Sequence, residues 1–393
     1  MSAVVAPTAR TSDPEAAESL RSCLRHLLLP SADGRWRMPD DISTDRFAAM
    51  AVRHRVVPLL HRHLDRLDLG DELAGRLRRR GEASRLQSLL LVRELGRALT
   101  ALEAAGIAVL VVKGIALAQA AHGDPAARGL GDLDLLVAPS EVGRACQALA
   151  GVGWSPAGGP APGDGRPWDH ALRFGYERCL VGKRSLVDLH WRLDPTAGAL
   201  PGFASLWPRR EYVRVGDLKV PTLGRWDALL HSCSHAAKDD WRWLRSLADV
   251  VVLAADDELW RDPPTRPTLI QQATLGLAFT LLGDPAVLPV RVARSAAAAA
   301  AGRQRHVRHE QAILGERSAR GRLPGFGTLA TVRRYWRGHR TPAELYRVVV
   351  ATAVPGHLLG GLNGHGWIRG TRTVLGRRLA RLKLWCRRPD TRR

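Results

Sequence analysis

Cysteine is scarce in this sequence, and no two cysteines lie close enough along the chain to form a paired motif. The 393 residues include five cysteines, far apart and without a CxxC pattern: Cys23, Cys146, Cys179, Cys233 and Cys386. Their spacing excludes a disulfide-rich scaffold and a zinc ribbon. Free thiols fit a reducing compartment, so we expect a cytoplasmic protein.

Long apolar runs are also missing. The first twenty residues, MSAVVAPTARTSDPEAAESL, lack the apolar segment of a signal peptide, so we expect no export. One stretch without formal charge lies between Arg347 and Arg369, but Pro355 and five glycines interrupt it. This stretch is too polar and too broken for a membrane-spanning helix, so we expect no transmembrane segment.

Lysine and acidic residues are scarce relative to arginine. The chain has 59 Lys+Arg, only five of them lysine, against 38 Asp+Glu, a formal charge of +21. Residues 301–393 hold 21 Lys+Arg and 4 Asp+Glu, so they carry +17 of this charge and the first 300 residues only +4. Three interpretations of this basic region stay open: an RNA-binding surface, contact with anionic lipid, or a solvated face without a specific partner.

Hydrophobic periodicity predicts an α+β fold, a small mixed sheet with helices embedded in a mainly helical protein. Apolar residues recur at helical spacing before residue 107, and a continuous apolar run, Ile107–Val112, then indicates a buried strand. The expected regions are an N-terminal helical region at 1–106, the sheet-containing core at 107–200, a helical region closing a cleft at 201–300, and a basic, mostly helical region at 301–393.

Three acidic residues lie on predicted strands of the core. Asp132 and Asp134 are two apart, so both carboxylates point to one face, roughly 6.5–7 Å apart at the backbone. Asp188 lies on a later strand, SLVDLHW, and joins them if the two strands are neighbours. Clustered carboxylates repel one another unless a cation neutralises them. We therefore predict that Asp132, Asp134 and Asp188 bind two divalent ions, Mg²⁺ or Mn²⁺, about 3.5–4 Å apart.

A Lys-Gly pair precedes these acids. Lys113 and Gly114 end the first strand and lead into a short helix, IALAQAAHG. The helix N-terminus and the glycine amide favour an anion, to which Lys113 adds a point charge. Arg128, four residues before Asp132, could form a forked contact with a phosphate. We predict that Lys113, Gly114 and Arg128 bind a triphosphate.

The segment VVKGIALAQAAHGDPAARGLGDLDLLV resembles the core motif of the uncharacterised nucleotidyltransferase family, within the polymerase-β-like superfamily. That motif is roughly LKGxALAxxxYxdpxxRxxxDIDLLV, and RHRVVPLL, VDLHWRL and LLHSCSHAAKDDWRWLRSLADVVVL are similar as well. The resemblance covers about residues 15–255. Two departures stand out: His122 replaces the usual tyrosine, and Lys113-Gly114 stands where the wider superfamily has Gly-Ser.

The resemblance implies a polymerase-β-type core that moves a nucleoside monophosphate from an NTP to an acceptor hydroxyl by a two-metal mechanism, releasing pyrophosphate. Asp132, Asp134 and Asp188 would be the catalytic metal ligands. The identity of the acceptor stays open. A Lys-Gly pair at this place is also similar to that of toxin-like nucleotidyltransferases, which would modify tRNA or other RNA. The alternative acceptor is a small molecule or a peptide. A catalytically inactive RNA-binding or scaffold protein is a third hypothesis, but a scaffold has no physical need for three clustered acids.

Other polar and aromatic residues have structural interpretations. Asp249 falls on the apolar face of LRSLADVVVL, and we expect it to pair with an arginine in the helical packing. His231 and His235 have an i, i+4 spacing that can bind zinc, but no third ligand is evident, so we expect a structural role. Three tryptophans could stack on bases but more often fill a core: Trp191, Trp241 and Trp243.

Overall fold

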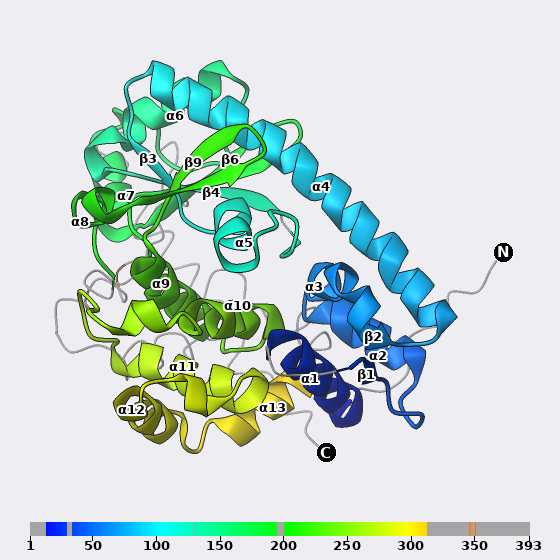
Figure 1. Cartoon of the computed structure of the whole chain (residues 1–393). Helices are drawn as coiled ribbons and strands as arrows, with labels where there is room; N and C mark the ends of the chain where they lie inside the picture. Colours follow the sequence, from blue (N-terminus) through cyan, green and yellow to red (C-terminus); the bar gives the residue numbers. More distant parts are fainter. Residues whose placement is uncertain are drawn as a thin grey trace, which may run out of the picture. The chain divides into compact units, whose positions relative to one another are not determined.

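The computed structural model describes residues 13–29, 34–129, 131–194, 200–312, 346 and 350. Figure 1 shows its elements in chain order. The chain forms two compact units, each built from separate stretches of sequence. The helical unit takes the described residues within Met1–Leu89, Leu117–Leu130 and Arg225–Gly321, and the sheet unit takes those within Leu90–Ala116, Gly131–Gly224 and Arg322–Arg393.

The sheet unit contains a seven-stranded mixed sheet in the order β5-β6-β7-β4-β3-β9-β8. Its central strands pair β7 parallel to β4 and β4 antiparallel to β3. The mainly helical α+β prediction with a small mixed sheet is therefore confirmed. The strands are β3 (Val109–Val111), β4 (Asp132–Val137), β5 (Ser155–Pro156), β6 (Glu177–Val181), β7 (Leu186–His190), β8 (Glu211–Val215) and β9 (Leu218–Thr222).

The centre of this sheet is buried, because β3 is wholly apolar and β4 is apolar apart from Asp132 and Asp134. Every residue of β3 is buried, and so is every residue of β4 after Asp132. A run of this kind is typical of a strand covered on both faces. The unit also holds α6 (Val142–Gly151), α7 (Arg166–Phe174) and α8 (Phe203–Leu206).

A close contact fixes the turn between β6 and β7. The indole Nε1 of the buried Trp154 donates to Ser185 Oγ at 3.1 Å. Gly182 lies against this indole, and a Cβ at that position would be 2.5 Å from Nε1. Only glycine leaves room for the ring, so the turn that leads into the Asp188 strand depends on it.

The helical unit contains eight whole helices among the residues that the structure describes. None of the helices in the described part of the chain is both long and apolar enough to cross a membrane. A ninth, α4 (Asp71–Ala104), begins in this unit and ends in the sheet unit. The eight are α1 (Pro14–Leu28), α2 (Thr44–Arg53), α3 (Val57–Arg62), α9 (Arg225–Lys238), α10 (Leu244–Ala254), α11 (Leu269–Leu282), α12 (Val290–Ala300) and α13 (Gln304–Ala312).

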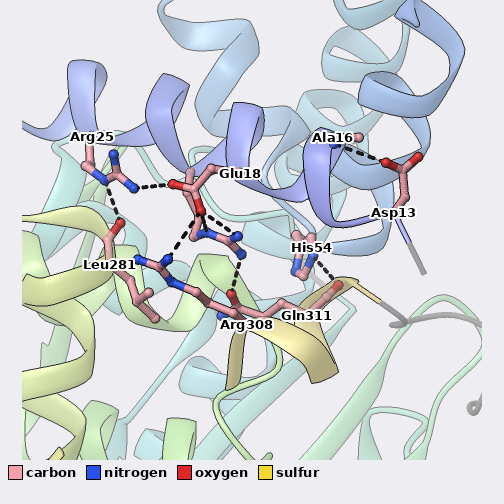
Figure 2. Close-up of polar contacts among 9 residues, drawn as sticks. Asp13, Ala16, Glu18, Arg25, His54, Leu281, Arg308 and Gln311 are labelled. Carbon is pink, nitrogen blue, oxygen red and sulfur yellow. Dashed lines mark hydrogen bonds and ion pairs between the residues drawn. The ribbon is translucent and has the colours of Figure 1, made fainter. Parts of the chain in front are cut away.

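Polar contacts between side chains join α1 to α13 in the helical unit (Figure 2). Glu18 accepts hydrogen bonds from Arg21 at 2.7 Å and Arg25 at 2.6 Å, while Arg21 also donates to Gln311 at 2.9 Å. Burial favours the neutral acid, but the two arginines hold the pKa of Glu18 below its usual value. The described start of the predicted 301–393 region, up to Ala312, thus belongs to the helical unit. The rest of the predicted 301–393 region lies almost wholly outside the described residues, and the four-region division stays a prediction.

Candidate active site

Strand register brings the predicted acids together on one face of the sheet. β4 and β7 run parallel, with Asp134 directly opposite Asp188 and Asp132 opposite Leu186. Because side chains alternate along a strand, Asp132 and Asp134 share the face that carries Asp188 and His190. The expectation that the Asp188 strand neighbours the Asp132–Asp134 strand is therefore confirmed.

Asp134 is the most enclosed of the three acids, with 4% of its side chain exposed. Its Oδ1 atom lies 2.6 Å from Lys113 Nζ and 3.0 Å from His190 Nε2. Burial favours the neutral acid, but Lys113 and His190 hold the pKa of Asp134 well below its usual value. Asp134 is therefore a buried carboxylate whose charge is balanced by a lysine.

Lys113 reaches this carboxylate from the connection between β3 and α5 (Gly114–His122). Burial disfavours its charge, but Asp134 outweighs that effect and raises the pKa of Lys113. Gly114 begins α5 with φ at 55°, a left-handed conformation that glycine adopts without strain. The structure thus places Lys113 at the acids and Gly114 at a helix N-terminus, as the predicted anion site requires.

Asp188 differs from Asp134 because none of the described lysines, arginines or histidines forms an ion pair with it. Burial, followed by the charges of Glu177, Asp134 and Asp132, raises the pKa of Asp188 to about 6. Cys179 stands opposite Asp188 in the β6–β7 pairing, and burial followed by the neighbouring Asp188 carboxyl raises the pKa of its thiol. A divalent cation bound at this strand face would offset its excess of negative charge.

Asp134, Asp188 and His190 could hold a metal ion. Each offers one ligand atom, and these atoms lie within 4.8 Å of one another. The second imidazole nitrogen, His190 Nδ1, is buried without a hydrogen bond to any described residue, and Glu177 Oε2 lies 3.4 Å from it. The two carboxylates suit the Mg²⁺ or Mn²⁺ expected from the sequence, whereas an imidazole is a commoner ligand of zinc and other transition metals. Asp132 acts on Lys113 and Asp188 through its charge but is not part of this cluster.

Arg128 has different partners within the helical unit. Its guanidinium lies 2.8 Å from Asp249 Oδ2, and His122 Nε2 lies 3.2 Å from the other oxygen of Asp249. Arg245 donates to the main-chain carbonyls of Arg128 and Gly129. The prediction that Asp249 pairs with an arginine is confirmed. Arg128 belongs to the helical unit, and its binding of triphosphate stays a prediction.

Two of the three tryptophans considered as base-stacking residues belong to the core. Trp191 is buried and donates through Nε1 to the carbonyl of Leu172, and buried Trp241 donates to Thr274 Oγ1. Trp243 is half-buried, with the Arg55 guanidinium 4.3 Å from the centre of its ring.

Sequence reasoning did not single out Glu177, Cys179 and His190. The signal for His190 was present, because it stands two residues after Asp188 on the same strand and so shares its face. Glu177 and Cys179 had no comparable signal, because only the β6–β7 register places them opposite His190 and Asp188.

The family comparison agrees with this arrangement. A family model described as uncharacterised nucleotidyltransferase matches residues 40–273, more than half of the chain, and the protein belongs to this family. The matched span includes Lys113 and the strand face from Asp132 to His190. Neither the curated proteins nor the solved structures give a significant match to the chain.

Proposed function

We propose that the protein transfers a nucleoside monophosphate from an NTP to an acceptor hydroxyl, through a core of the polymerase-β type. The observation that carries the proposal is the β4–β7 register, which places Asp134 beside Asp188 with Asp132 on the same face and Lys113 against Asp134. A metal-free anion-binding site would need cations on this face, whereas it carries acids in excess.

Asp132, Asp134 and Asp188 would hold two divalent ions, Mg²⁺ or Mn²⁺. Bound ions of this kind neutralise charge on the phosphates and lower the pKa of a coordinated hydroxyl. Lys113 and the Gly114 amide would hold the triphosphate, with Arg128 as a further proposed contact. Most of the rate enhancement would come from positioning and charge stabilisation.

The proposed reaction is an in-line displacement at the α-phosphorus. The acceptor oxygen forms a bond to this phosphorus, and the bond from the phosphorus to the oxygen that bridges to the β-phosphate breaks. Pyrophosphate leaves with that oxygen. Asp188 would complete the shell of the metal beside the acceptor and favour loss of the hydroxyl proton.

The test is incubation with each NTP labelled in the α-phosphate, Mg²⁺ and a cell extract separated into RNA, protein and small-molecule fractions. We expect label to enter one fraction and Asp132→Asn to reduce it about 100-fold or more. Asp217→Asn is the matched control, because Asp217 is an exposed acid in the β8–β9 turn. Equal labelling by Asp132→Asn and the wild type would show the mechanism to be wrong.

RNA is the acceptor favoured by the charge of the chain. Residues 301–393 carry 21 Lys+Arg against 4 Asp+Glu, an excess suited to a polyanion. Label in RNA that falls steeply with added salt supports this acceptor. Label in the protein or small-molecule fraction supports the other acceptors, and the basic region would then be incidental to the reaction.

A further inference from the structure

We propose that Lys113 is an exchangeable counter-ion: it neutralises Asp134 until a divalent ion takes its place, and the released ammonium group then moves to the triphosphate. This inference rests on the proposed function and adds an order of events to it. The geometry behind the proposal is the ion pair itself, with Lys113 Nζ 2.6 Å from Asp134 Oδ1.

The exchange follows from the burial of Asp134. A carboxylate with 4% of its side chain exposed needs a cation beside it, and Lys113 provides that charge in the metal-free protein. His190 adds a contact to the same oxygen but lies further away, at 3.0 Å. Lys113 is therefore the group whose charge a metal would replace.

Lys113 and a metal bound to the same oxygen would repel one another. A divalent ion binds carboxylate oxygens at about 2.0–2.2 Å, which would put it within roughly 5 Å of an ammonium group still at 2.6 Å from Oδ1. At such distances two positive charges in a poorly solvated site repel strongly. Lysine can leave because its charge sits at the end of a flexible four-carbon stem, unlike the rigid fork of arginine.

The released lysine has a destination within reach of its own backbone. Lys113 immediately precedes Gly114, the first residue of α5, where main-chain amides favour an anion. A phosphate bound there would form an ion pair with the ammonium group that Asp134 has released. Metal binding and triphosphate binding would thus be coupled through one side chain.

The first experiment measures the exchange in the wild-type protein, where folding is not altered. Lysine acetylation by a small reagent is followed residue by residue by mass spectrometry, with Mn²⁺ added and then with Mn²⁺ plus NTP. We expect the acetylation rate of Lys113 to rise about tenfold with Mn²⁺, since removing an ion-pair partner worth about 1.4 kcal/mol exposes the amine tenfold more often. It should fall again with NTP. Exposed Lys183 is the internal control and should not change.

The second experiment measures Mn²⁺ binding without nucleotide, by electron paramagnetic resonance of free Mn²⁺. Lys113→Met should bind Mn²⁺ about tenfold more tightly than the wild type, because the competing cation is gone, while Lys183→Met should bind like the wild type. Unchanged or weaker binding by a folded Lys113→Met, or a Lys113 acetylation rate that does not respond to Mn²⁺, overturns the exchange.

Failure of the exchange is distinguishable from failure of the proposed function. If the wild type binds Mn²⁺ and Asp134→Asn does not, the metal site stands whatever Lys113 does. If the wild type binds no Mn²⁺, the metal site falls and the exchange falls with it.

Discussion

His190 Nε2 lies 3.0 Å from Asp134 Oδ1, and both side chains are almost fully buried. The imidazole therefore orients the carboxylate that we propose as a metal ligand. Replacing His190 by alanine should weaken Mn²⁺ binding about 10- to 100-fold, the usual effect of losing such a partner of a metal ligand. Calorimetric titration checks this, with His306→Ala, an exposed histidine of α13, as the control. If His190→Ala binds Mn²⁺ as tightly as the wild type, His190 has no role in the metal site.

Asp188 should make the stability of the metal-free protein fall as pH rises from about 4 to above 6. Its pKa is raised from 3.8 to about 6, so over this range the folded state binds a proton that the unfolded state has lost. The stabilisation is complete below the unfolded pKa and is lost as pH passes the folded value. Asp188→Asn has no such proton, so its unfolding free energy relative to the wild type should increase with pH. Urea unfolding at several pH values measures this, and a constant difference would contradict it.

The Arg128–Asp249 pair should contribute mainly to the stability of the helical unit. Both side chains are buried, with 6% and 2% exposed, so Arg128→Met leaves the Asp249 charge without its arginine. We expect a loss of about 3–5 kcal/mol in unfolding free energy, and a smaller loss when Asp249→Leu is added, because the double variant leaves no buried charge. A double variant less stable than Arg128→Met would show that the unpaired Asp249 charge does not cause the loss of unfolding free energy. Arg128→Met with wild-type stability but weaker NTP binding would instead support a direct contact with triphosphate.

Gly182→Ala should destabilise the sheet unit by about 1–3 kcal/mol, the typical cost of overpacking. Its Cβ would lie 2.5 Å from Trp154 Nε1, so the indole must move and its hydrogen bond to Ser185 must weaken. Tryptophan fluorescence during urea unfolding reports both effects. Gly151→Ala is the matched control, because a Cβ at the end of α6 meets nothing within 4 Å and should leave stability nearly unchanged.

The central strands and two of the predicted acids could be predicted from local pattern. β4 is apolar apart from Asp132 and Asp134, and the leucines and valine around these acids indicate a buried strand without any long-range knowledge. The two-residue spacing of Asp132 and Asp134 fixes their common face in the same way. The sequence placed Asp188 beside these two acids only if its strand was a neighbour of theirs. The β4–β7 pairing meets that condition.

The remaining features depend on contacts between residues distant in sequence. β8 and β9 pair at one end of the sheet, and their mixed exposed and buried residues gave no clear strand pattern. Glu177 enters the site only through pairing with the His190 strand. Arg128 stands four residues before Asp132, yet its partner is Asp249, more than a hundred residues later, which no spacing argument reveals.

The interleaving of the two units along the chain has a consequence for synthesis on the ribosome. All strands of the seven-stranded sheet have been made by Thr222, whereas α1, α2 and α3 still lack α9 to α13, which complete their unit. The segment Leu117–Leu130, which carries Arg128, is made long before its partner Asp249. Domains generally fold as units while the chain emerges from its N-terminus. Here the strands that carry the acids can form first, and the segment that joins Gly114 to Asp132 reaches its final contacts only after α10 has been synthesised.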